Sequence, residues 1–218
     1  MTPYQIRLLE TVEEMHAIEK LTDDIWRGGA TEIVPVHMLT AFIHNGGLAL
    51  GAFDNGEMIG FVFGFPGLIQ TPQGIQAKHC SHQMGVHPDH RGKNIGFALK
   101  QAQWQMARQQ GLDLITWTYD PLLSRNAYLN IARLGAICNT YKRNEYGNLE
   151  DKLNAGIASD RFQVDWWLNT RRVMQHVDSE KRVALTLKNY LEADAQILHT
   201  PETNVDLGLL MPPKHYSP

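Results

Sequence analysis

The chain of 218 residues has 23 Asp and Glu against 20 Lys and Arg, a formal net charge of −3 at pH 7, and 43% of its residues are hydrophobic. This composition is typical of a soluble protein with one domain, or with one domain and an extension, and its scattered basic residues argue against nucleic acid as a partner. We find no apolar run long enough to cross a bilayer and no basic start followed by an apolar run, so we expect a cytoplasmic protein without a membrane partner.

The first third of the chain predicts the order strand, helix, helix, strand, strand. Thr11 with Glu14 three residues later forms a capping-box pattern at the start of the first helix. The pair Asn55-Gly56 between two apolar runs predicts a β-hairpin. The expected elements are a strand at Tyr4–Leu9, helices at Thr11–Trp26 and Pro35–His44, strands at Leu48–Phe53 and Met58–Phe65, and a loop at Pro66–Gly74.

The segment Ala77–Gln110 organises the rest of the chain. It predicts a strand to Val86, a polar turn, and an amphipathic helix from about Ile95. Further elements are expected as a strand at Leu114–Tyr119, a helix at Ser124–Leu134 ended by Gly135, and strands at Phe162–Leu168, Arg182–Leu187 and Ala195–His199. Parallel strands joined through the Ile95 helix would form a βαβ unit with a crevice at the carboxyl ends of its strands.

The turn before this helix carries the hexapeptide Arg91-Gly92-Lys93-Asn94-Ile95-Gly96. A helix amino terminus offers free N–H groups and the positive end of its dipole, which suits an anionic diphosphate. The hexapeptide resembles the acetyl-CoA pyrophosphate loop of the GNAT superfamily, whose pattern is Arg or Gln, two residues, Gly, one residue, and Gly or Ala. Asn94 stands where that pattern has its first glycine.

A wider resemblance extends over about Leu8–Trp167. The segments GLALGAFD, GFVFGFPG, LITWTYDPLLSRNAYLN and NAGIASDR are similar to a branch of predicted GNAT acetyltransferases with unassigned substrate. This resemblance implies an α/β GNAT fold, with a central twisted mixed sheet flanked by helices. It implies a core at residues 1–150, and residues 151–218 would be an extension that completes the sheet, covers the acceptor site or forms a dimer contact.

The resemblance also implies an activity: transfer of an acetyl or other acyl group from acetyl-CoA to the amine of a small molecule or peptide, by direct attack. A non-catalytic acyl-CoA-binding module is the alternative, because the sequence departs from the family pattern at Asn94 and at Ile131. The residues expected to bind acetyl-CoA are Met84, Gly85, Val86, Arg91, Gly92, Lys93, Asn94, Ile95, Gly96 and Asn126.

The proton-transfer residues are less clear from the sequence. Many GNAT enzymes have a tyrosine four residues before the helix-ending glycine, which protonates the departing thiolate, but Ile131 holds that position here. Tyr128, three residues earlier, either replaces it or only packs against the helix. His79 and His82 are candidates for the general base. Their separation of three places them on opposite faces of a strand, so only one can face the acceptor and together they cannot hold a metal.

Two features are interpreted as structural. Glu32 lies in the segment that lines the acceptor site in GNAT proteins, but an exposed loop carboxylate is the preferred reading. Cys80 and Cys138 are too few for a disulfide framework and have no neighbouring basic residue, so we expect free thiols that form no acyl-enzyme.

Overall fold

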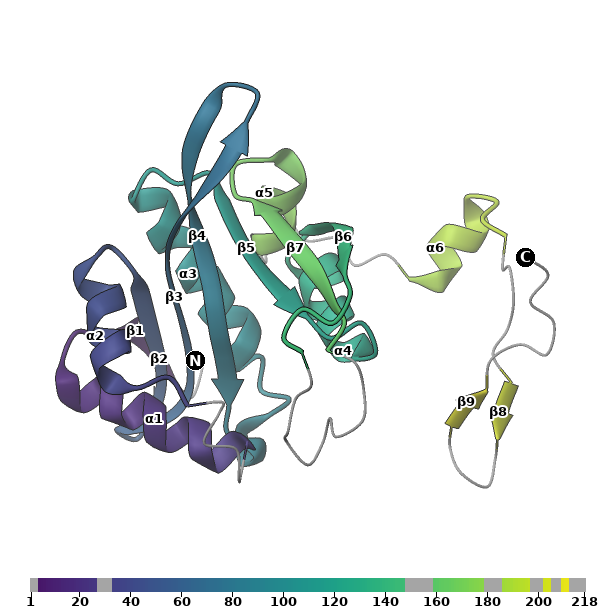
Figure 1. The fold of residues 1–218 in the computed structure, drawn as a ribbon. Helices are drawn as coiled ribbons and strands as arrows, with labels where there is room; N and C mark the ends of the chain where they lie inside the picture. Colours follow the sequence, from purple (N-terminus) through teal and green to yellow (C-terminus); the bar gives the residue numbers. More distant parts are fainter. Residues whose placement is uncertain are drawn as a thin grey trace. The chain divides into compact units, whose positions relative to one another are not determined.

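The computed structural model describes residues 4–26, 33–147, 159–178, 186–196, 202–204 and 209–211. The chain forms two compact units, residues 1–182 and residues 183–218. In the first unit, a seven-stranded sheet has the order β1-β2-β3-β4-β5-β7-β6 (Figure 1). Its elements are β1 Gln5–Leu8, α1 Val12–Trp26, α2 Val36–His44, β2 Leu48–Asp54, β3 Glu57–Thr71, β4 Gly74–Val86, the short 3₁₀ helix η2 Pro88–His90, α3 Ile95–Gln109, β5 Leu114–Tyr119, α4 Ser124–Ala127, the π-helical η3 Tyr128–Arg133, β6 Ile137–Lys142, β7 Arg161–Trp167 and α5 Arg171–Val177. The second unit contains α6 Leu187–Glu192 and a small hairpin of β8 Glu202–Asn204 and β9 Leu209–Met211.

Local sequence signals account for the first elements. The capping box is confirmed, because the Thr11 N–H donates to Glu14 Oε2 at 3.0 Å and the Glu14 N–H donates to Thr11 Oγ1 at 3.3 Å. The hairpin of β2 and β3 is also confirmed: Asn55 and Gly56 have φ of 49° and 86°, the left-handed backbone that a tight two-residue turn needs.

The predicted loop at Pro66–Gly74 is wrong. β3 runs on to Thr71 and β4 begins at Gly74, so these residues form a long antiparallel hairpin in which Pro66 lies opposite His79. A proline is tolerated here because β2 pairs with β3 only as far as Gly64. Beyond that residue β3 is an edge strand, where a missing N–H costs no ladder hydrogen bond.

Helices cover both faces of the sheet (Figure 1). On one face, α1 and α2 pack on β3 through a cluster that includes Met15, Leu39 and Phe63. On the other face, α3 packs on β2 and β3 through a second cluster that includes Leu50 and Leu99. The apolar faces that the sequence pattern predicts for these helices therefore determine the three-layer arrangement.

The end of the sheet formed by β5, β7 and β6 is built partly from residues beyond 150. The predicted strand at Phe162–Leu168 is confirmed as β7, which lies between β5 and β6 and pairs antiparallel with both. The following α5 was not predicted; its Val173 and Val177 are buried in the cluster around Trp166. The predicted strands at Arg182–Leu187 and Ala195–His199 fall largely outside the described residues, and Leu187 begins a helix.

Candidate active site

β4 and β5 are parallel neighbours that separate after two residue pairs. His79 lies opposite Ile115 and Cys80 lies opposite Thr116, and these are the pairs that the two strands form in the described structure. β4 then continues to Val86, paired with β3 alone, while β5 continues to Tyr119, paired with β7 alone. The two strands therefore diverge toward their carboxyl ends (Figure 1). We call this divergence the fork; the facing edge of β4 in it, from Ser81 to Val86, lacks a strand partner within the described residues.

A β-bulge lies where the fork begins. Phe63 pairs with Gln83 and Gly64 pairs with Ser81, so that His82 is an extra residue on β4. A bulge bends a strand and redirects the side chain of the extra residue. His82 is accordingly exposed to solvent although it lies in the middle of the sheet.

His82 lies on the face covered by α1 and α2. Its ring centroid is 5.5 Å from that of Phe63 and 5.8 Å from that of Phe65, and Phe65 in turn packs against Phe42 of α2. Partial desolvation by these rings lowers the pKa of His82 below its usual value of 6.5. The imidazole is therefore mostly neutral near pH 7, which is the form that accepts a proton.

His79 lies on the opposite face, as its spacing from His82 predicts. It is fully buried, and the amide Nε2 of Gln103 on α3 donates to its Nε2 at 3.2 Å. Burial, together with the charge of Lys100, lowers the pKa of His79 to about 3. A group that is this weak a base and this deeply buried is poorly suited to take a proton from an incoming amine.

The backbone conformation of the loop after β4 accounts for an asparagine at residue 94, where the expected pattern has a glycine. Asn94 has φ of 65°, in the left-handed region, and Asn is among the few residues other than Gly that adopt it readily. Its side chain is held by Arg133, whose Nη2 donates to Asn94 Oδ1 at 2.8 Å. The left-handed backbone at this position is thus adopted by an asparagine whose side chain Arg133 holds in place.

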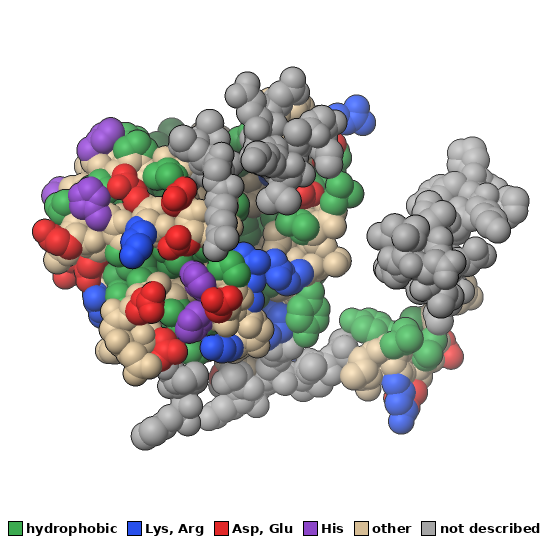
Figure 2. All heavy atoms as spheres, turned by 90° about the horizontal axis from the view of Figure 1, so that it is seen from below, with side chains coloured by type: hydrophobic (Ala, Val, Ile, Leu, Met, Phe, Trp, Pro, Cys, Tyr) green, Lys and Arg blue, Asp and Glu red, His purple; other side chains and the backbone are tan. Residues whose placement is uncertain are grey.

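This loop has free hydrogen-bond donors. In the described structure no hydrogen bond uses the backbone N–H groups of Gly92, Lys93 or Asn94, and the first N–H groups of α3 have no partner within the helix. Arg91 and Lys93 add positive charge, and the last carboxylate before α3 is Asp89. The loop therefore fits a diphosphate. Figure 2, which views the molecule from the end where β4 finishes, shows Lys and Arg interspersed with Asp and Glu on this face.

Two expected cofactor glycines have different roles in the fold. At Gly85 a Cβ would lie 2.6 Å from Ile25 Cδ1 and 3.1 Å from Trp26, so this glycine lets the end of α1 approach β4. At Gly96 a Cβ would meet only Met84, at an ordinary 3.6 Å, and the backbone φ there is not positive. Packing of the fold therefore does not require a glycine at residue 96. Val86 and Ile95 flank the loop, at the end of β4 and at the start of α3.

The helix after β5 differs from the expected one. It is α-helical only over α4 and becomes a π-helix from Tyr128, as in the hydrogen bond from the Leu134 N–H to the Leu129 oxygen at 2.9 Å. The wider π turn changes the side-chain spacing on which the comparison of Tyr128 with Ile131 rested. Tyr128 is 57% exposed, and Asn126 is half-buried in α4.

A buried lysine was missed in the sequence. Lys100 is only 3% exposed, and its Nζ donates to Ser81 Oγ at 2.7 Å and to Gln103 Oε1 at 3.1 Å. The same Nζ lies 3.8 Å from the centre of the Trp117 ring. The sequence contained one indication that this lysine is buried: it lies three residues after Phe97, on the helix face that is otherwise apolar.

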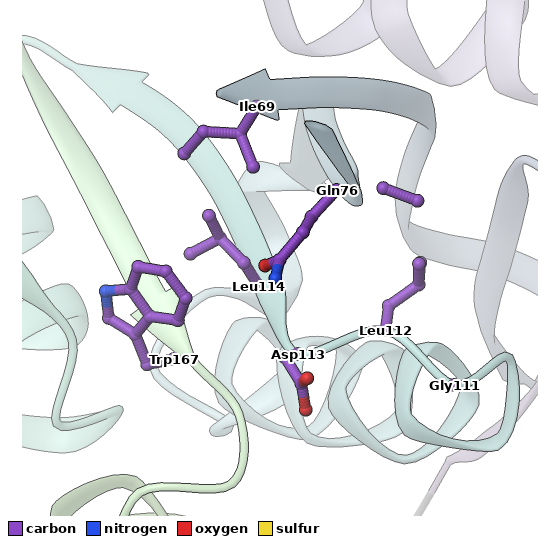
Figure 3. Close-up of a pocket in the computed structure, with 8 residues that line it drawn as sticks. Ile69, Gln76, Gly111, Leu112, Asp113, Leu114 and Trp167 are labelled. Carbon is purple, nitrogen blue, oxygen red and sulfur yellow. The ribbon is translucent and has the colours of Figure 1, made fainter. Parts of the chain in front are cut away.

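A separate pocket lies at the amino-terminal end of β5, on the far side of the β4–β5 pairs from the fork (Figure 3). Its volume is about 210 Å³. Apolar walls and the polar groups of Gln76 and Asp113 line it; the full set is Ile69, Gln76, Ala77, Gly111, Leu112, Asp113, Leu114 and Trp167. No group of three or more His, Cys, Asp or Glu in the described part of the chain is arranged to hold a metal ion. None of the described helices is long and apolar enough to span a membrane.

Comparison with known proteins identifies the family. The sequence model of the acetyltransferase (GNAT) family matches residues 15–129. The structure resembles the ribosomal-protein-S18-alanine N-acetyltransferase of Escherichia coli, with a TM-score of 0.60 at 15% identity over 77% of this chain and 95% of that chain. It also resembles NAA60 of Arabidopsis thaliana in complex with a bisubstrate analogue, with a TM-score of 0.59 at 14% identity over 76% and 99% of the two chains. A third similar structure is yncA of Salmonella typhimurium with its cofactor acetyl-CoA, with a TM-score of 0.58 at 18% identity over 77% and 95%.

No curated protein sequence matches this chain. The family match covers more than half of its residues, so the chain belongs to the acetyltransferase (GNAT) family. The mixed α/β fold expected from the sequence is confirmed. The protein is therefore an acetyltransferase.

Proposed function

We propose that this acetyltransferase transfers the acetyl group of acetyl-CoA to a primary amine of a small molecule or peptide, by direct attack of the amine on the thioester. The observation that best supports this proposal is the fork between β4 and β5. It leaves one edge of β4 unpaired and leads directly into the loop with free N–H groups at the start of α3. An extended chain that ends in a diphosphate, such as the pantetheine arm of CoA, fits this combination of a strand edge and an anion site.

The binding residues have distinct tasks in this proposal. The N–H groups of the loop Arg91–Gly96 and the charges of Arg91 and Lys93 hold the diphosphate. Main-chain amides of the β4 edge near Met84–Val86 hydrogen-bond the pantetheine arm and polarise the thioester carbonyl. Asn126, half-buried in α4, follows the carboxyl end of β5 in the chain, and its amide is assigned a hydrogen bond to the same arm.

His82 is the general base in this proposal. It is exposed on the α1 and α2 face, it stands at the bulge where the fork begins, and its lowered pKa keeps it neutral near pH 7. The attacking amine must lose a proton as the N–C bond forms, and a neutral imidazole within reach of that proton accelerates the step by roughly 10²- to 10⁴-fold. His79 faces α3 and takes no part in this step.

The test of the transfer is release of CoA from acetyl-CoA, followed with a thiol reagent, over a panel of small-molecule and peptide amines. We expect at least one amine to release CoA faster than water does. With that amine, His82→Gln should lower kcat by at least about tenfold with little change in the Kd for acetyl-CoA. Absence of amine-dependent CoA release over the whole panel would contradict the proposal.

The test of the binding loop is isothermal titration with acetyl-CoA. Gly96→Asp places a negative charge and bulk beside the diphosphate and should weaken binding by well over tenfold. Gly96→Ala is the matched control, because the added Cβ meets only Met84 at an ordinary contact distance and so reports the effect of bulk without charge. Equal affinity in Gly96→Asp and the unchanged protein would remove the loop from the binding site.

A further inference from the structure

The amine of Lys100 lies at the base of the fork. Cys80 and Thr116 are the last paired residues of β4 and β5, and the next residue on each strand contacts Lys100: Ser81 Oγ at 2.7 Å and the Trp117 ring at 3.8 Å. Lys100 reaches this point from α3, one and a half turns into the helix that begins at the diphosphate loop. Its Nζ therefore bridges the two strands at the point where they begin to separate.

The surroundings of this amine are neutral. Its contacts are a hydroxyl, an amide oxygen and an aromatic ring, and no carboxylate of the described chain pairs with it. The titratable group that faces it is His79 of β4, which is linked to it through Gln103 of α3. Burial lowers the pKa of Lys100 from 10.5 to about 7. An unpaired buried lysine opposes folding, so its presence at this point calls for a functional reason.

We propose that Lys100, acting through the hydroxyl of Ser81, supplies the proton that the departing thiolate of CoA takes up. This inference rests on the proposed function. It assigns the step for which the family commonly uses a tyrosine at the position held here by Ile131, and it explains how the chain works without that tyrosine. Ser81 is the catalytic residue of the pair, and Lys100 is the proton source behind it.

The step balances without any further reactant. The amine nitrogen bonds to the carbonyl carbon, the C–S bond breaks, and its electron pair goes to sulfur. Ser81 Oγ–H, which donates to Gln103 Oε1 in this structure, turns away from that oxygen and gives its proton to sulfur, while the Lys100 ammonium gives one to Ser81 Oγ. The proton lost by the attacking amine, taken first by His82, returns through solvent to Lys100, so the products are the amide and CoA thiol.

Three variants separate this role from packing. Lys100→Met removes the proton source and takes no hydrogen bond away from Ser81 and Gln103 as a pair, because Ser81 Oγ still donates to Gln103 Oε1 at 3.0 Å. Lys100→Gln keeps a polar group in place that is not an acid, and Ser81→Ala removes the relay. Lys188→Met, at an exposed lysine of α6, is the control for loss of a lysine.

The first readout is steady-state kinetics with the amine found in the panel. We expect kcat to fall by roughly 10²-fold or more in Lys100→Met, Lys100→Gln and Ser81→Ala, with the Kd for acetyl-CoA within about threefold of the unchanged protein. A proton donor must be protonated to act, so kcat of the unchanged protein should fall as pH rises through the pKa of Lys100, and the Lys100 variants should lack this fall. Unchanged kcat and an unchanged pH profile in Lys100→Met would overturn the proposal.

The second readout needs no acceptor amine. Lys100 and the thiol are coupled through the Ser81 hydroxyl: the ammonium favours the thiolate, and the thiolate in turn favours the ammonium. The thiol of bound CoA, followed by its ultraviolet thiolate absorbance, should therefore titrate at lower pH in the unchanged protein than in Lys100→Met. Identical titration in both proteins would overturn the proposal even if the amine panel succeeds. If no amine in the panel released CoA but the thiol titration still differed between the two proteins, the proposed acceptor class would be wrong, and the placement of Lys100 and Ser81 at the sulfur would stand.

Discussion

Lys100→Met should make the protein more stable near neutral pH and should remove part of the pH dependence of its free energy of unfolding. The pKa of Lys100 is lower in the folded protein, about 7, than the usual 10.5. Between these values the unfolded chain binds a proton that the native protein does not, so stability rises with pH across this range and is lowest below pH 7. At roughly 1.4 kcal/mol for each pKa unit, burial of this amine costs about 5 kcal/mol below pH 7.

The net gain is smaller, because the substitution also removes favourable contacts. The cost of about 5 kcal/mol reflects burial alone and leaves out the Trp117 ring. The face of this ring attracts the ammonium by about 2 kcal/mol in a desolvated site, and methionine lacks this attraction. We therefore expect Lys100→Met to raise the free energy of unfolding by about 3 kcal/mol at pH 6, and the difference to fall toward zero near pH 10.5.

Urea unfolding followed by circular dichroism at pH 6, 8 and 10 measures this difference. We expect the difference in free energy of unfolding between Lys100→Met and the unchanged protein to decline as the pH rises. A simple packing change would instead shift the free energy of unfolding equally at every pH. Lys188→Met should have the same stability as the unchanged protein at each pH, because that lysine is exposed and its pairing with Glu192, at 3.7 Å, is a surface ion pair. A Lys100→Met protein that is less stable by the same amount at all three pH values would refute the reasoning.

Three further predictions concern other residues. The native pKa of His79 is about 3, below the usual 6.5, so only the unfolded chain takes up a proton at this residue as the pH falls between these values. The free energy of unfolding should therefore drop over this range. Urea unfolding at pH 7 and pH 4 should show a smaller drop for His79→Gln than for the unchanged protein. Tyr128→Phe should change kcat by less than about threefold, because the exposed hydroxyl is not needed when Lys100 supplies the proton; a hundredfold loss with unchanged Kd for acetyl-CoA would assign the acid to Tyr128. Asn94→Ala should cost about 1–2 kcal/mol in thermal unfolding because φ there is positive, whereas Asn94→Gly should cost less.

Around the candidate site, the strand and the helix that short sequence patterns specify were predicted correctly. The strand, turn and helix around Arg91–Gly96 follow from an apolar strand, a Pro and Gly turn and an amphipathic helix, all of which are local signals. The loop at Pro66–Gly74 was predicted wrongly for a physical reason: whether proline disrupts a strand depends on the extent of the neighbouring strand β2, whose first residue, Leu48, lies opposite Gly64.

The π-helical turn at Tyr128 is another feature that the local sequence does not specify. The segment Ser124–Leu134 has the caps and composition of an ordinary helix, yet its second half is a π-helix. Arg172 of α5 donates to the Gly135 oxygen at 2.9 Å and to the Ile131 oxygen at 3.3 Å, so a later helix holds the carbonyls at this helix end. Such contacts join residues about forty positions apart and have no signature in either segment.

The sequence by itself determined most helices and strands of the first unit, the loop at Arg91–Gly96 and the family resemblance, because hydrophobic period, turn residues and helix ends act over a few neighbouring positions. Only the tertiary structure decided which polar residues meet. Ser81 and Lys100 lie nineteen positions apart, and Trp117 comes from a third element. They come together because β4 and β5 separate after Cys80 and Thr116, and the point of separation depends on the bulge in β4 and on β7, which pairs with β5 from more than forty residues later in the chain.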